Sequence, residues 1–228
     1  MKRCAVIVAA WQAQSTILNC IKSIRAQYPL DGWEYELRVG VDGCNSTAET
    51  LRCAHVSYYW SRENVGTYIM ANSLIALGPA DIYTRFDADD IMLPNYLQTV
   101  IPVALQWGIC HAGCKMLGKV KPRVGQVTMT AATLAALGGF AEARCHSDRD
   151  FARRAALAGL DIQGMRQDPR LQAPLFIKGM GPKSLTHNPK TRYGSKYRKE
   201  IEAELGKLRE AGQIKIEPKA TELSRCQP

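Results

Sequence analysis

Long hydrophobic runs are missing from this sequence. No stretch approaches the ~18 consecutive apolar residues that a membrane-spanning helix needs, and the apolar run after Met1–Arg3 ends at Trp11. We therefore expect neither an integral membrane protein nor a secretory signal. Paired zinc ligands are missing too, because Cys110 and Cys114 have no second Cys/His pair at finger-like spacing. The sequence therefore does not favour a zinc-finger protein.

What is present is typical of a packed protein. The 228 residues are 46% hydrophobic and 22% charged, which is enough for one sizeable core, or for one domain with an appendage. The eight cysteines are scattered and several lie in apolar runs, where a free thiol behaves as a small hydrophobe. Reduced cysteines predict a cytoplasmic location.

Positive charge is concentrated in the C-terminal segment. The net charge is +9, and residues 178–228 hold 12 Lys or Arg against 6 Asp or Glu. This segment fits a nucleic acid, an anionic membrane surface, an anionic substrate or a solvated face. It also carries an apolar stripe at helical spacing, made of Tyr197, Ile201, Leu205 and Leu208. We therefore expect a domain at 1–177 and a basic helical extension at 178–228 that packs on it, with the residues after Gly212 frayed.

Strand and helix patterns alternate in the first hundred residues. Apolar runs predict strands at Cys4–Ala9, Tyr35–Val41, Val56–Trp60 and Asp81–Phe86, with helical patterns between them. This alternation predicts an α/β fold with a mixed, mostly parallel sheet and helices on both faces. The second half is less regular. There we expect a loop at Lys115–Gly125, a strand at Gln126–Met129 and a last strand at Ala173–Ile177.

Polar residues follow three of these strands directly. They are Trp11 with Gln12, Asp42, and the group Asp87, Asp89 and Asp90. Ligands of parallel sheets bind beyond the carboxyl ends of the strands, so we expect these residues to converge on one edge. Three carboxylates within four positions repel one another, and a cation offsets that cost. Mg²⁺ and Mn²⁺ prefer oxygen ligands of this kind, so one interpretation is a divalent metal site. The alternative interpretation is a solvated acidic turn before the next helix.

Six segments resemble, in the same order, motifs of the family 2 nucleotide-sugar glycosyltransferases of the GT-A fold. Phe86–Pro94 (FDADDIMLP) resembles the DxD region, and Val41–Thr47 (VDGCNST) resembles a "VDDGSTD"-type turn. The other segments are Ala9–Gln12, Arg62–Gly66 with Asn72, Leu137–Phe140 (LGGF), and His146–Asp150 with Arg154. The resemblance covers about residues 5–159 and leaves out the basic C-terminal segment.

The resemblance implies an inverting transfer of a sugar from a nucleotide-sugar donor. Asp89 would be the chief ligand of Mn²⁺ or Mg²⁺, with Asp87 beside it and His187 completing the metal shell. Asp148 matches the second acidic residue of the family's "ED" pair, which implies the general base for the acceptor hydroxyl. A helix cap before Phe151 is the alternative role for Asp148.

The resemblance also implies a set of donor-binding residues, namely Ala9, Trp11, Asp42, Arg62, Asn64, Arg85, Asp87 and Asp89. Trp11 would stack on the base, and Asp42 would accept hydrogen bonds from base or ribose. The sequence departs from the family pattern at four positions in these segments. Gly43 and Asn45 stand where Asp is frequent, Ser147 replaces Glu, and Ala71 stands where Arg is common.

Three functions remain open. The first is transfer from a UDP-sugar to a saccharide. The second is the same transfer to a modified nucleic-acid base, held by the basic tail and by Lys115–Arg123, which has four basic residues and no acid. The third is a non-catalytic nucleotide-sugar-binding protein. A nucleotidyltransferase would need a Gly-rich basic loop after the first strand, which residues 9–14 lack.

Overall fold

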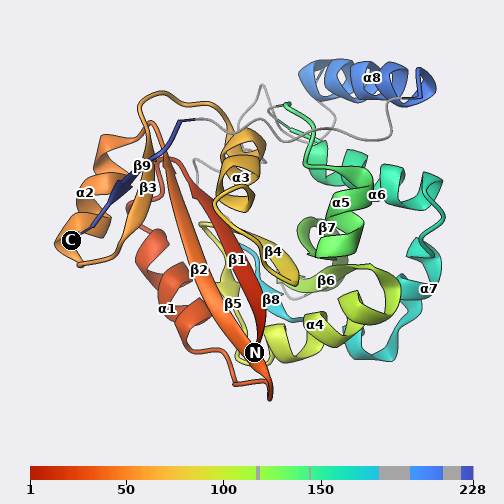
Figure 1. Ribbon diagram of the computed structural model, residues 1–228, viewed down its shortest axis with the longest axis horizontal. Coiled ribbons are helices and arrows are strands. Elements are labelled where there is room, and N and C mark those ends of the chain that lie inside the picture. The colour runs from red at the N-terminus through yellow and green to blue at the C-terminus, as the bar shows by residue number, and fades with distance from the viewer. Residues whose placement is uncertain (117–118, 144, 180–195, 213–221, 228) are drawn as a thin grey trace.

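The computed structural model describes residues 1–116, 119–143, 145–179, 196–212 and 222–227 (Figure 1). Its described strands form one nine-stranded sheet in the order β5-β8-β6-β7-β4-β1-β2-β3-β9. The strands are β1 (Lys2–Ala10), β2 (Trp33–Asp42), β3 (Tyr58–Ser61), β4 (Ile82–Asp87), β5 (Ile91–Met92), β6 (Ile109–Met116), β7 (Lys119–Thr130), β8 (Phe176–Ile177) and β9 (Ser224–Cys226).

The centre of the sheet is parallel, as the alternation of strands and helices predicts. Strand β1 pairs in parallel with both β2 and β4, and β2 pairs in parallel with β3. The register places Ala9 beside both Gly40 and Asp87, so β1, β2 and β4 end close together. Antiparallel pairs lie further out, between β4 and β7 and between β3 and β9. The predicted α/β fold with a mixed sheet is confirmed.

The described helices connect and cover these strands. They are α1 (Ile17–Arg25), α2 (Asn45–Cys53), α3 (Thr67–Ile75), α4 (Tyr96–Trp107), α5 (Ala131–Leu137), α6 (Ser147–Leu157), α7 (Ile162–Gln167) and α8 (Lys196–Glu210), with a short 3-10 turn at Pro169–Leu171. In α1, the four apolar residues at helical spacing, Ile17, Cys20, Ile21 and Ile24, are all buried.

Helix α3 packs directly on β1 and β2, and a glycine makes that contact possible. A Cβ atom at Gly40 would lie 2.4 Å from the sulfur of Met70 on α3. A larger residue at position 40 would therefore require the side chains of Met70 and Leu74 on α3 to move. Because α3 begins at Thr67, this packing also sets the position of Tyr68 at the carboxyl end of the strands.

The segment expected to be a loop, Lys115–Gly125, is instead part of a β-ladder apart from residues 117–118, which lie outside the described residues. Strands β6 and β7 pair in antiparallel fashion, with Cys114 opposite Lys121 and Gly113 opposite Pro122. The register shifts between His111 and Gly113, which marks a β-bulge or irregularity. Glycine and proline made this stretch resemble a loop. The paired strand satisfies the backbone groups regardless of that local preference.

Described residues of the C-terminal segment contact the rest of the protein at α8 and at Ser224–Cys226, and Lys178 and Gly179 contact the acidic turn after β4. Helix α8 lies beside α6, where Arg153 pairs with Glu202 at 2.6 Å and Arg209 pairs with Asp150 at 2.5 Å (Figure 1). We expected the residues after Gly212 to fray. The structure instead pairs Ser224–Cys226 with β3, so β8 is not the last strand. No helix in the described ranges is long and apolar enough to cross a membrane.

Candidate active site

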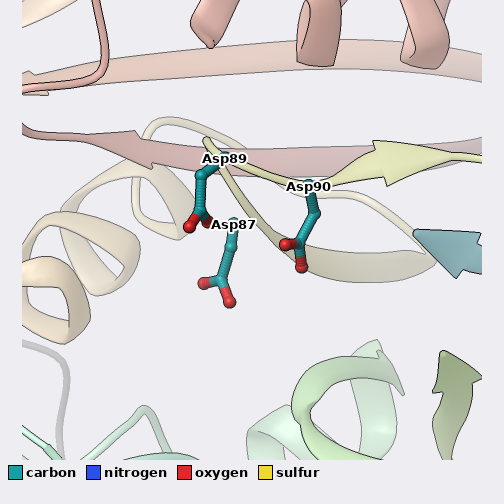
Figure 2. A group of neighbouring side chains, drawn as sticks. All are labelled: Asp87, Asp89 and Asp90. Atoms are coloured by element: carbon teal, nitrogen blue, oxygen red, sulfur yellow. The ribbon is translucent and has the colours of Figure 1, made fainter. Parts of the chain in front are cut away.

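Three carboxylates meet where β4 ends. Asp87 is the last residue of β4, and Asp89 and Asp90 follow in the turn before β5. One oxygen from each lies within 4.8 Å of the others, and Figure 2 shows the three side chains pointing to the same side of the turn. The turn is tight because the backbone N–H of Asp90 donates to the carbonyl of Asp87 at 3.2 Å. The predicted convergence of acidic side chains is therefore present.

Two basic side chains bind Asp87, one at each carboxylate oxygen. Arg85 Nη2 donates to Oδ1 at 2.6 Å, and Lys178 Nζ donates to Oδ2 at 2.9 Å. Burial raises the pKa of Asp87, but the charges of Arg85 and Lys178 outweigh that effect and hold the pKa below its usual range. Asp87 is therefore an ionised carboxylate in this site.

Asp90 is the most deeply buried member of the triplet. It is 0% exposed and accepts hydrogen bonds from Gln126 Nε2, Lys178 Nζ and, at 2.8 Å, the backbone N–H of Gly179. Burial is the main cause that raises the pKa of Asp90 to about 7, and the neighbouring carboxylates add to it. Burial likewise raises the pKa of Asp89, whose side chain is 26% exposed. Concentrated negative charge in a buried place favours a bound cation.

A second chain of contacts connects the triplet to Asp148. Tyr68 Oη donates to Asp148 Oδ1 at 2.9 Å, and the guanidinium of Arg85 lies over the Tyr68 ring, 4.9 Å from its centroid. Arg85 in turn pairs with Asp87. Burial and the charge of Asp148 raise the pKa of Tyr68, so its hydroxyl remains a donor. The acidic turn and the predicted base therefore face one site.

Asp148 is not the capping residue of its helix. Helix α6 begins at Ser147, with His146 in the N-cap position, so Asp148 lies inside the first turn. The side chain of Asp148 contacts Tyr68 on α3, which is 80 residues away in sequence. This geometry favours a role in the site over the cap that the sequence left open.

Asp42 holds the loop that follows β3. The residue is 2% exposed, and its two oxygens accept the backbone N–H groups of Val65, at 2.7 Å, and Gly66, at 3.0 Å. Asn64 Nδ2 donates to the Asp42 carbonyl at 3.5 Å. Asp42 and Asn64 therefore shape this loop together, and their contact with a nucleotide stays a prediction.

The first loop and the Asp42 turn lie against each other. The backbone N–H of Gln12 donates to Cys44 Sγ at 3.3 Å, and that of Ala13 donates to Thr47 Oγ1 at 2.9 Å. Trp11 stands at the end of β1 and is 45% exposed, which leaves its ring open to solvent. An exposed indole beside these strand ends is available for stacking on a base.

The other predicted donor residues differ in exposure. Ala9 is partly buried within β1, next to Asp87 of β4. Arg62 is exposed in the loop between β3 and α3. His187, the predicted third metal ligand, lies outside the described residues. These three roles stay predictions.

Two residues of the site, Lys178 and Tyr68, are missing from the set that the sequence predicts. Lys178 directly follows β8, so the rule that polar residues after strands gather at one edge applies to it, although the charge distribution places it in the basic extension. Tyr68 carries no such signal. It reaches Asp148 only because α3 packs on β1 and β2, and that is a tertiary contact.

The carboxylates suit a divalent metal of the Mg²⁺ or Mn²⁺ type. Their oxygens converge within 4.8 Å, and hard cations prefer oxygen ligands. The acidic charge also exceeds the basic charge in direct contact with it, because three carboxylates meet Arg85 and Lys178. The residues present therefore fit such an ion.

Comparisons with known proteins agree with this geometry. Residues 5–112 match the family model of glycosyl transferase family 2. The S. aureus TarS 1-349 structure in complex with UDP-GlcNAc is 14% identical, with a TM-score of 0.62, over 79% of this chain and 60% of that one. The mannosyltransferase PcManGT from Pyrobaculum calidifontis, in complex with GDP-Man and Mn²⁺, is 15% identical, with a TM-score of 0.63, over 82% and 61%. None of the curated proteins matches.

The arrangement of strands and helices is the GT-A fold of these two structures. Residues 5–112, just under half of the chain, are similar to glycosyl transferase family 2. The chain spans about three fifths of the length of the two solved structures described above.

Proposed function

We propose that this protein transfers a sugar from a nucleotide-sugar donor, a UDP-sugar, to a hydroxyl group of a saccharide, with inversion at the anomeric carbon. One observation carries the proposal: Asp148 and the Asp87–Asp90 triplet are joined through Arg85 and Tyr68 into one site at the carboxyl edge of the sheet. The match of residues 5–112 to the family 2 model and a TarS structure in complex with UDP support the donor class.

The donor diphosphate binds beside the acidic turn in this proposal. Asp89 and Asp87 would hold Mn²⁺ or Mg²⁺, and the PcManGT structure in complex with Mn²⁺ supports this assignment. A divalent cation held there supplies neutralisation of the negative charge that develops on the departing nucleotide diphosphate. Trp11 stacks on the base, while Asp42, Asn64 and Arg62 border the nucleoside. His187 is the proposed additional ligand.

Asp148 acts on the acceptor. An acceptor hydroxyl has a pKa far above 7 and needs a base on the face of the sugar opposite the leaving group. Asp148 accepts the hydroxyl proton while the oxygen attacks the anomeric carbon and the bond to the diphosphate breaks. Tyr68 orients Asp148 through its hydrogen bond at 2.9 Å. A single displacement of this kind inverts the anomeric configuration.

The test is a thermal-shift panel of UDP- and GDP-sugars, each measured with Mn²⁺ and with EDTA. A ligand that binds only the native state at 100 times its Kd stabilises by about 2.7 kcal/mol, which for a protein of this size raises Tm by roughly 5–10 °C. We expect that shift with a UDP-sugar and Mn²⁺ and not with EDTA. If no nucleotide sugar changes Tm in either condition, the proposed donor class is wrong.

A further inference from the structure

The ammonium group of Lys178 lies inside the carboxylate triplet. Nζ is 2.9 Å from Asp87 Oδ2, 3.0 Å from Asp90 Oδ1 and 3.8 Å from Asp89 Oδ1. The side chain is 10% exposed. Burial opposes its charge, but Asp87 and Asp90 outweigh burial and raise the pKa of Lys178, so the group is a cation. One ammonium therefore contacts all three acids that suit a metal.

The backbone on both sides of Lys178 is fixed against this turn. Ile177 of β8 pairs with Ile91 of β5, and the N–H of Gly179 donates to Asp90 Oδ1 at 2.8 Å. A Cβ atom at Gly179 would lie 1.8 Å from the carbonyl oxygen of Asp89, so only glycine permits this approach. The lysine side chain, with its flexible four-carbon stem, is the part that can move.

Lys178 and a divalent metal compete for the same oxygens. Carboxylate ligands stand about 2.0–2.1 Å from Mg²⁺, and Lys178 already donates to Asp87 and Asp90. With charges of +1 and +2 about 4 Å apart, even the dielectric constant of water gives a repulsion that lowers metal affinity about thirty-fold. In a buried site, where the dielectric constant is lower, the penalty is larger.

We propose that Lys178 is a resident cation of the metal-free site, and that a divalent metal binds only by displacing its ammonium group from Asp87. Lys178 thereby sets how much metal the protein requires. The displaced ammonium remains a positive charge at the edge where the donor diphosphate binds. This inference rests on the metal site of the proposed function.

The first experiment titrates Mn²⁺ alone into the wild-type protein and into Lys178→Met by calorimetry. Methionine keeps the unbranched stem and removes the charge. We expect Lys178→Met to bind Mn²⁺ at least about thirty-fold more tightly than the wild type. The control is Lys207→Met, which changes an exposed lysine on α8 and should leave the affinity unchanged. Equal affinity in wild type and Lys178→Met would overturn the role of Lys178 while leaving the metal site intact.

The other outcomes are also decisive. If circular dichroism shows that Lys178→Met folds only in the presence of Mn²⁺, the proposal is supported, because the metal then replaces the missing cation. No Mn²⁺ binding by either protein, even with UDP present, would overturn both this inference and the metal dependence of the proposed function.

A second measurement uses the unmodified protein, in case Lys178→Met does not fold in any condition. Amine labelling by reductive methylation, read by mass spectrometry, reports the accessibility of each lysine. We expect Lys178 to be protected without metal and to be labelled at least fivefold faster with saturating Mn²⁺, with Lys207 unchanged. Labelling of Lys178 that does not respond to Mn²⁺ would show that the ammonium is not displaced.

Discussion

Two clusters of buried charge in this protein differ in their balance. On α6, Asp150 is 3% exposed and pairs with two arginines, Arg154 at 2.8 Å and Arg209 at 2.5 Å. At the end of β4, three carboxylates share Arg85 and Lys178. In the first cluster two basic side chains contact one carboxylate, so positive charge is in excess. In the second cluster two basic side chains contact three carboxylates, so negative charge is in excess. A buried excess of negative charge is costly without a further cation, so the comparison separates a structural ion pair from a binding site.

The largest expected effect comes from breaking the α6 cluster. Arg154 also donates to the carbonyls of Leu137 and Gly139 at 2.7 and 2.8 Å. Arg154→Met leaves these groups and Asp150 without that partner, and we expect the free energy of unfolding to fall by about 3–5 kcal/mol. Urea unfolding measures the change, with exposed Arg166→Met on α7 as the control. A loss under about 1 kcal/mol would mean that this cluster does not hold the fold.

The next effect concerns catalysis. Asp148→Asn is nearly isosteric and removes the proposed base, so we expect turnover to fall about 10²-fold or more while donor affinity is kept. Steady-state kinetics and calorimetry with UDP give the two values. Asp31→Asn, at an exposed position before β2, is the control. Unchanged turnover would exclude Asp148 as the base, and a large fall in Tm would favour a structural role.

A smaller effect is expected at Tyr68. Tyr68→Phe keeps the ring under Arg85 and removes only the hydroxyl that donates to Asp148. A hydrogen bond to a charged group contributes about 1.5 kcal/mol, so we expect kcat to fall about tenfold with the donor KM unchanged. Tyr28→Phe, at a 53% exposed tyrosine, is the control. A raised KM at constant kcat would show that Tyr68 serves binding and does not position Asp148.

The smallest effect is expected at the basic helix. Lys196, Lys199 and Lys207 are exposed on α8, and replacing all three with Gln should leave transfer to a saccharide almost unchanged. A nucleic-acid acceptor would behave differently, because each lost phosphate contact lowers the slope of log affinity against log salt by about 0.7–0.9. Binding to DNA and to anionic liposomes should be measured side by side. Specific DNA binding at physiological salt, lost in the Gln variant, would overturn the saccharide acceptor.

The sequence predicted the parallel centre of the sheet because its signals are local. The apolar run at Cys4–Ala9 is a buried strand, and Ile17, Cys20 and Ile24 form the buried face of the next helix. The polar residues after β1, β2 and β4 meet at one edge because parallel strands end together. Elements with strong periodicity were therefore predictable.

The rest depends on contacts between distant residues. Pairing of β6 with β7 overrides the loop-like composition of Lys115–Gly125, and pairing with β3 orders Ser224–Cys226. In the site, Lys178 reaches Asp87 across 91 positions, and Tyr68 reaches Asp148 across 80. No local pattern predicts the contact of Tyr68, and the position of Lys178 directly after β8 indicates only the edge of the sheet, not its partners. The sequence supplied the acids of the site, and the fold supplied the groups that hold them.

The most direct test of this account is calorimetry of UDP binding with and without Mn²⁺, in the wild-type protein and in Asp89→Ala. Asp89 is partly exposed at a strand end and does not form part of the core, so the variant should remain folded by circular dichroism. We predict that the wild type binds UDP in a Mn²⁺-dependent way and that Asp89→Ala loses this binding. Undiminished, still metal-dependent affinity in Asp89→Ala would contradict the account.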